Sequence, residues 1–138
     1  MEKVFIIKEF IKNFVIKDRR DRVEFQLSNS SKRDQFIQKL NHSYAEVLDM
    51  RRFKILPNTQ DDFEYIKSEL GIRSQDQCYV ISNYDDIDDC FLELETAFSK
   101  SYGRGFATLI INLQGDKLYL ETEETGHQHR FTGLAGQR

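Results

Sequence analysis

The sequence has few of the residues that mark disulfide-bonded, disordered or membrane-spanning chains. Its 138 residues include no tryptophan, one proline, seven glycines and two cysteines. So little proline and glycine argues against a disordered chain. The two cysteines lack metal-type spacing, which favours a reduced, cytoplasmic protein. No apolar run approaches the roughly 20 residues of a membrane span, and Lys3, Lys8 and Lys12 interrupt the apolar N-terminus, so we do not expect a signal peptide.

What the chain does contain is aromatic residues and an uneven charge. Eleven phenylalanines and six tyrosines in this length predict one domain with a sizeable core. Residues 1–54 hold 13 Lys and Arg against 8 Asp and Glu, whereas residues 55–138 hold 7 against 15, giving net charges of +5 and −8. This asymmetry is typical of self-association or of an acidic face for a basic partner, and also of charges that only solvate exposed faces.

The clearest structural signals lie between residues 77 and 122. Residues 77–82 and 106–113 are apolar runs typical of buried strands, and residues 117–122 predict another strand. Between the first two lies an amphipathic helical stripe of Ile87, Phe91, Leu94 and Phe98. If the strands on either side of this helix are parallel neighbours, the crossover between them is right-handed.

The segment 106–122 is predicted to form a hairpin that turns at Gly115 and Asp116. This turn pairs Ile111 with Leu120. One face of the ribbon is then aliphatic and predicted to be core, with Leu109, Ile111, Leu113, Leu118 and Leu120. The other face is predicted to be only partly covered and carries Ile110, Asn112, Tyr119 and Glu121.

The first half of the chain supplies further elements. Residues 2–17 predict an amphipathic helix for core packing or for contact with a second copy. Residues 23–27 alternate like a strand, with a continued helix as the rival. Residues 36–48 predict a helix and residues 50–56 a short strand. A further helix, over 63–70, is expected to be capped at Asn58 or Thr59 and to stop at Gly71.

Together these patterns predict an α+β, or mixed α/β, fold. We expect three to four helices packed on a four- to six-stranded sheet that includes the 106–122 hairpin. Residues 127–131 are a candidate last strand. Residues 1–131 would form a single domain, and residues 132–138 a flexible tail.

The acidic loop after residues 77–82 is the first candidate site. Tyr84, Asp85 and Asp86 are followed by Asp88 and Asp89. If this segment is a helix, Asp85, Asp88 and Asp89 share one side of it, and their carboxylates could bind Mg²⁺ or Ca²⁺. The spacing of a calcium loop is absent, and Asp is also common at helix starts because it satisfies free N–H groups.

Other candidate ligands are weaker. His127 and His129 would share one side of a strand and are candidates for a transition metal. Arg104, between two glycines, is a candidate for binding an anion, although phosphate loops precede a helix and this segment precedes a strand. Residues 17–22 hold four cations, but two aspartates interrupt them and no aromatics interleave, so we expect a solvated loop and no nucleic-acid partner.

The sequence therefore favours a small, non-catalytic, bacterial-type cytoplasmic protein that binds a protein partner without a cofactor. A regulatory or neutralising role, like that of an immunity protein, would use the acidic C-terminal half. The residues predicted to bind are Tyr84, Asp85, Asp86, Asp88, Asp89, Arg104, Glu121, Glu123 and Glu124. One alternative is a small enzyme or ligand-binding domain with its site at the 82–89 loop. Another is an oligomeric module that forms a homodimer through residues 1–17.

Overall fold

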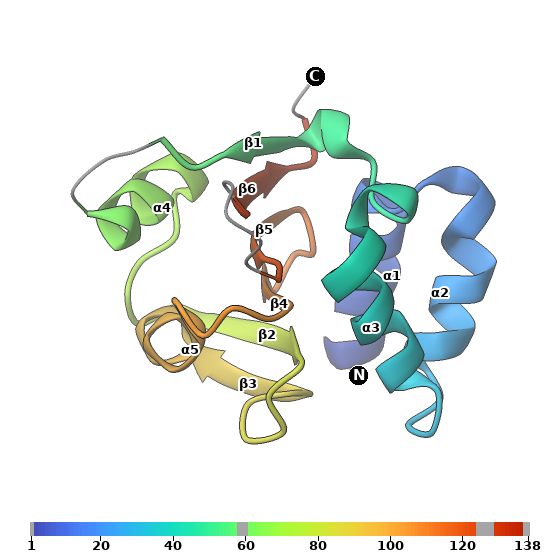
Figure 1. The fold of residues 1–138 in the computed structure, drawn as a ribbon. Coiled ribbons are helices and arrows are strands. Elements are labelled where there is room, and N and C mark those ends of the chain that lie inside the picture. The colour runs from blue at the N-terminus through green and yellow to red at the C-terminus, as the bar shows by residue number, and fades with distance from the viewer. Residues whose placement is uncertain (1, 58–60, 124–128, 137–138) are drawn as a thin grey trace.

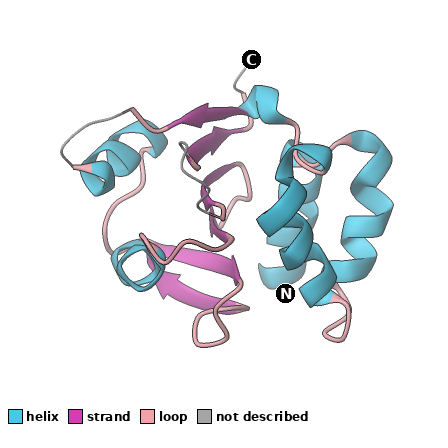
Figure 2. Ribbon diagram, in the orientation of Figure 1, coloured by secondary structure: helices cyan, strands magenta, loops and turns pink. Residues whose placement is uncertain are grey.

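The computed structural model describes residues 2–57, 61–123 and 129–136. One six-stranded antiparallel sheet with the order β1-β6-β5-β4-β2-β3 lies between two helical layers (Figure 1). Figure 2 shows the strands as the central layer and the helices on either side. The strands are β1 (Phe53–Ile55), β2 (Gln77–Ser82), β3 (Cys90–Glu93), β4 (Thr108–Asn112), β5 (Lys117–Glu121) and β6 (Arg130–Leu134). The predicted α+β class of a single domain is confirmed.

Three helices cover one face of the sheet: α1 (Glu2–Phe14), α2 (Arg20–Leu27) and α3 (Arg33–Ser43). The buried residues of α1 are those of the predicted stripe: Ile6, Ile7, Phe10, Ile11 and Phe14. They share one core cluster with Leu109, Ile111, Leu118 and Leu120 of the β4–β5 ribbon. The aliphatic face of the ribbon is therefore core, as predicted, but α1, α2 and α3 cover it.

Two helices cover the opposite face: α4 (Asp62–Leu70) and α5 (Leu94–Ser101). Leu94 and Phe98 pack there with Ile110 and Tyr119. Helix α5 therefore packs on the face of Tyr119 and not on the aliphatic face. The prediction that the Tyr119 face is only partly covered is wrong, because Ile110 and Tyr119 are buried. The described chain holds five α-helices, where three to four were predicted.

The hairpin forms, but its register differs by two residues from the prediction. Ile111 pairs with Leu118, and Leu109 with Leu120. The cause is a longer turn, because the side chain of Asn112 accepts hydrogen bonds from the backbone N–H groups of residues 116 and 117 at 3.0 and 3.1 Å. A shift of two residues keeps every side chain on its own face, which is why the predicted faces remain correct.

The single helix predicted over Ile87–Phe98 is two elements. The chain turns at Asp89, which has a φ of +61°, and its N–H bonds the carbonyl of Val80 at 2.9 Å. Aspartate tolerates this left-handed conformation better than most residues. Residues 90–93 then return as edge strand β3, antiparallel to β2, and helix begins only at Leu94. Strands β2 and β4 are neighbours but antiparallel, so the condition for a right-handed parallel crossover is not met.

Three smaller predictions concern residues 23–27, the C-terminal strand and the start of α4. Residues 23–27 lie in α2, so the strand prediction is wrong and the rival helix is correct. Strand β6 runs to Leu134, so residues 132–134 are strand where a tail was predicted, and Thr132 pairs with Tyr119. The caps predicted at residues 58 and 59 lie outside the described residues, and the Asp61 side chain caps α4.

Three short 3₁₀ helices, over Lys17–Arg19, Tyr44–Glu46 and Met50–Arg52, join these elements. Within the described parts of the chain, no helix is both long enough and apolar enough to cross a lipid bilayer.

Candidate functional site

Two loops far apart in the sequence lie side by side at one end of the sheet. The first, residues 83–89, follows β2, and the second, residues 102–107, joins α5 to β4. The N–H of Asn83 bonds the carbonyl of Ala107 at 2.9 Å. The N–H of Phe106 bonds the hydroxyl oxygen of Tyr84 at 3.0 Å. These cross-loop bonds fix the two loops relative to each other.

The predicted residues Tyr84, Asp86 and Arg104 come together at this junction. The guanidinium carbon of Arg104 lies 3.6 Å from the centroid of the Tyr84 ring, a cation–π contact. A guanidinium nitrogen of Arg104 lies 3.6 Å from Asp86 Oδ1, and Arg104 Nη1 donates to the carbonyl of Lys100 at 2.8 Å. The arginine is therefore held from three sides at the surface.

Exposed aromatic rings extend this junction. Phe106 is 41% exposed, and its ring meets that of Tyr84 edge-on at 6.5 Å. Tyr102 is 39% exposed and donates its hydroxyl to Asp62 of α4. We call Tyr84, Asp86, Arg104 and Phe106 the Tyr84–Arg104 surface.

Beneath this surface lies the buried carboxylate of Glu121 on β5. It has no exposed area, and its Oε2 accepts the N–H groups of Gly103 at 3.0 Å and Gly105 at 3.3 Å. Gly103 and Gly105 have φ values of +80° and +93°, which most side chains would disfavour. Glu121 therefore anchors the loop that carries Arg104 from below.

Further groups on the same face compensate the charge of Glu121. The Tyr119 hydroxyl donates to Glu121 Oε1 at 2.8 Å, and Arg130 Nε lies 3.6 Å from the same oxygen. Burial raises the pKa of Tyr119 well above its ordinary value, and the adjacent negative charge raises it further. The guanidinium of Arg130 also lies 4.6 Å from the Tyr102 ring centroid. A buried carboxylate with such partners positions backbone and is closed to solvent.

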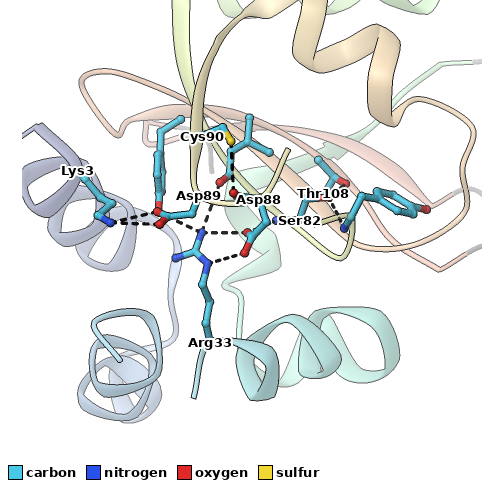
Figure 3. A network of polar contacts seen from close by, with 10 residues as sticks. Lys3, Arg33, Ser82, Asp88, Asp89, Cys90 and Thr108 are labelled. Atoms are coloured by element: carbon cyan, nitrogen blue, oxygen red, sulfur yellow. Dashed lines mark hydrogen bonds and ion pairs between the residues drawn. The ribbon is translucent and has the colours of Figure 1, made fainter. Parts of the chain in front are cut away.

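Asp88 forms an ion pair with an arginine of the helical layer. Arg33, at the start of α3, donates Nε to Asp88 Oδ2 at 2.9 Å and Nη2 to Oδ1 at 3.0 Å (Figure 3). Asp88 Oδ1 also accepts the N–H of Ser82 at 2.8 Å. Arg33 is buried, with 10% of its side chain exposed. Burial lowers the pKa of Arg33, but the bonds to Asp88 and the neighbouring charges outweigh this and raise it overall.

Asp89 is held in the same network. It accepts the hydroxyl of Tyr79 at 2.6 Å and lies 3.2 Å from Lys3 Nζ (Figure 3). Burial raises the pKa of Asp89, but the hydrogen bonds from Tyr79 and Lys3 and the charge of Arg33 outweigh it and leave this pKa below the ordinary value. Burial, with the bond to Asp89, raises the pKa of Tyr79 strongly. The shared helix side predicted for Asp85, Asp88 and Asp89 does not form, because this segment is a turn.

The remaining predicted residues are dispersed. Asp85 is exposed and borders a cavity of about 170 Å³ next to the Arg33 pair. Glu123 lies 3.2 Å from His42 Nδ1. His129 is buried, whereas Glu124 and His127 lie outside the described residues. In the part of the chain that the structure describes, no group of three His, Cys, Asp or Glu side chains could hold a metal ion.

The thiol of Cys78 is a poor nucleophile. Cys78 is buried in β2, and burial raises the pKa of its thiol to about 12, with a smaller contribution from Asp76. A thiol with so high a pKa is almost wholly protonated at neutral pH, and the thiolate is the reactive form. Cys90 lies on edge strand β3 and donates to the carbonyl of Asp88 at 3.4 Å.

Sequence reasoning missed the cations and the aromatic residues of both networks. Arg33 and Lys3 precede their carboxylate partners by 55 and 86 residues, and no local pattern links them. A signal for Glu121 was present, because strand alternation places it on the face of Tyr119. Phe106 was predicted to be the first residue of a buried strand, but β4 begins two residues later.

Comparisons of this sequence and fold with protein-family models, curated proteins and solved structures found no match.

Proposed function

We propose that this protein is a non-catalytic module that binds another protein through the Tyr84–Arg104 surface. The observation that carries the proposal is the stacked Arg104 and Tyr84 pair beside the exposed ring of Phe106. Protein interfaces are enriched in tyrosine, phenylalanine and arginine, and such residues supply most of the binding energy.

The surface is ordered before any partner binds. Glu121 holds the backbone N–H groups on both sides of Arg104, and Phe106 N–H bonds the Tyr84 hydroxyl. Side chains that are already fixed lose little conformational freedom on binding, which improves affinity without new contacts. This order supports recognition of a defined partner.

The acidic part of the surface is smaller than the sequence predicted. Asp88 and Asp89 bond Arg33, Tyr79 and Lys3, so they contribute to the fold. The exposed carboxylates of this loop that remain for a partner are Asp85 and Asp86. We propose a partner with a basic rim around an apolar centre, and a regulatory or neutralising role of the immunity type in a bacterial cytoplasm.

Binding is favoured over catalysis by the state of the loop after β2. The cavity that Asp85 borders, at about 170 Å³, is smaller than the roughly 300–1,000 Å³ of typical small-molecule sites. Two more carboxylates border this cavity: Asp88 is neutralised by Arg33, and Asp34 lies 3.5 Å from the amide nitrogen of Gln38. The Tyr84 hydroxyl accepts a backbone hydrogen bond.

The test begins with crosslinking in the native cell and mass spectrometry, followed by titration of the purified partner. Phe106→Ala and Arg104→Ala are expected to raise the Kd about tenfold or more, because hot-spot residues contribute at least about 1.4–2 kcal/mol each. Matched controls are Phe25→Ala, from a ring 53% exposed on α2, and Arg73→Ala, whose side chain is 75% exposed. Equal affinity of the two site variants and the wild type would contradict the proposal.

A second candidate is self-association through α1, favoured by two exposed apolar side chains. Val4 and Phe5 are 55% and 54% exposed. Deleting residues 1–17 would remove core residues, so the test is Phe5→Ser followed by mass measurement over a range of concentrations. A wild-type mass that rises with concentration, and a constant monomer mass for the variant, support the dimer. A monomer at all concentrations in both proteins excludes it.

A further inference from the structure

An apolar groove lies between α1 and α2, two helices that run next to each other (Figure 1). Its volume is about 330 Å³, and its apolar side chains are those of Val4, Ile7 and Leu27. Ile7 and Leu27 are buried, whereas Val4 is 55% exposed. We call this feature the α1–α2 groove. It leaves apolar surface from two helices open to contact from outside.

The order of residues along the groove follows from the directions of the two helices. The groove brings residues 3–8 of α1 together with residues 24–28 of α2. A connection of only five residues, 15–19, joins the helices, so they are antiparallel neighbours. Lys8 and Glu24 therefore lie at about the same height along the groove, and Val4 lies at the height of Leu27 and Ser28.

The two helices carry opposite charges at the groove. Lys3 and Lys8 border it from α1, and Glu24 borders it from α2. Lys3 is paired with Asp89, at 3.2 Å. Lys8 and Glu24 are exposed, and neither side chain forms an ion pair or a hydrogen bond with any residue that the structure describes. An unpaired cation and an unpaired carboxylate thus lie on opposite sides of an apolar groove.

We propose that a second copy of this chain covers the α1–α2 groove, related to the first by a two-fold axis that runs along the groove. Such an axis places α1 of each copy against α2 of the other at the same height. Lys8 of each copy then meets Glu24 of the other, and Val4 packs on Leu27 and Ser28 of the other. An axis that placed α1 on α1 would bring lysines together, which is unfavourable.

This inference rests on the second candidate function, self-association through α1, and specifies the interface. The test is sedimentation equilibrium of the full chain over a range of concentrations. Lys8→Glu and Glu24→Lys are each expected to weaken the dimer at least about tenfold, because each change turns two attractive contacts into repulsive ones. Both variants should keep the wild-type Tm, since the two side chains are exposed and unpaired in one copy.

An equimolar mixture of the two variants is the decisive measurement. In a dimer of one Lys8→Glu chain and one Glu24→Lys chain, both contacts are attractive again. We therefore expect the mixture to dimerise with a Kd within about threefold of the wild type, although neither variant does so alone. A role of Lys8 and Glu24 within a single chain would not produce this recovery.

Matched controls are Lys100→Glu and Glu95→Lys, which change the net charge equally at exposed positions of α5, on the opposite face of the sheet. Each is expected to change the Kd less than about twofold. A wild-type protein that stays monomeric at all concentrations, or that binds phosphatidylserine vesicles as a monomer only, overturns both the self-association and this interface. A wild-type dimer that Lys8→Glu and Glu24→Lys leave unchanged, or whose variants do not recover on mixing, overturns the interface alone.

Discussion

Two buried charged groups, Arg33 and Glu121, lie on opposite faces of the sheet and differ in what they hold. Arg33 reaches from the helical layer to the carboxylates of the 83–89 loop, and 10% of its side chain stays exposed. Glu121 has no exposed area and holds the 102–107 loop on the face of α4 and α5. The first group joins two layers of the fold, and the second positions the Tyr84–Arg104 surface.

The difference between them shows how solvent access determines how much a charged group contributes to stability. Asp88 and Asp89, the partners of Arg33, are 18% and 41% exposed, so water replaces part of any lost interaction. The closest partners of Glu121 are a buried hydroxyl and backbone N–H groups, which water reaches poorly. A charge left alone in such a site is costly because little solvent stabilises it. Substitutions at the two centres should therefore differ in size.

The largest effect is expected for Glu121→Gln. This change removes the buried negative charge that Arg130 and the Tyr119 hydroxyl face, and it weakens the bonds to the N–H groups of Gly103 and Gly105, at a cost of about 3–5 kcal/mol in unfolding free energy. Chemical denaturation measures the loss. A loss below about 1 kcal/mol would show that Glu121 is not an anchor.

A smaller loss, about 2–3 kcal/mol, is expected for Arg33→Met, which keeps the apolar stem and removes the bonds to Asp88. Denaturant unfolding of this variant and of Glu121→Gln, in the same buffer, ranks the two centres. A greater loss at Arg33 than at Glu121 would reverse the comparison.

Tyr79→Phe is expected to cost about 1 kcal/mol, because it removes one hydrogen bond to Asp89. The pKa of Asp89 is lower in the folded protein than its ordinary value of 3.8, so its contribution is complete above that pH and is lost as the pH falls through the folded value. The difference between wild type and variant should therefore narrow below pH 3.8. A difference that widens in acid would contradict this sign.

The smallest effect is expected for Lys3→Gln. The side chains of Lys3 and Asp89 are 47% and 41% exposed, and pairs this open contribute less than about 0.5 kcal/mol. Thermal unfolding at low and high salt checks this expectation. A loss above 1 kcal/mol in unfolding free energy would show that the exposed pair of Lys3 and Asp89 stabilises the fold more than such pairs usually do.

The sequence predicted the fold well where a local pattern decides the structure. The stripe of Phe10 and Phe14 in α1, the Gly71 stop of α4 and the aliphatic face of the ribbon follow from periodicity and turn chemistry. The prediction of one helix from Ile87 to Phe98 was wrong. The apolar spacing fits a helix, but pairing with β2 makes residues 90–93 a strand.

The candidate site was predictable only in part. Tyr84, Asp86 and Arg104 were named from two loops, but their contact depends on β2 and β4 being antiparallel neighbours. The loss of Asp88 and Asp89 to internal pairs depends on Arg33 and Lys3 in distant helices. Such pairings come from the fold as a whole, and a single sequence carries no local sign of them.

The claim at the centre of this account is that buried Glu121 holds the loop that presents Arg104. Amide hydrogen exchange at Gly103 and Gly105, followed by NMR, measures this directly. We expect both amides to exchange at least about tenfold slower than in an unstructured chain, and to lose this protection in Glu121→Gln while Ile110 in β4 stays protected. Exchange at the unstructured rate in the wild-type protein would contradict the account.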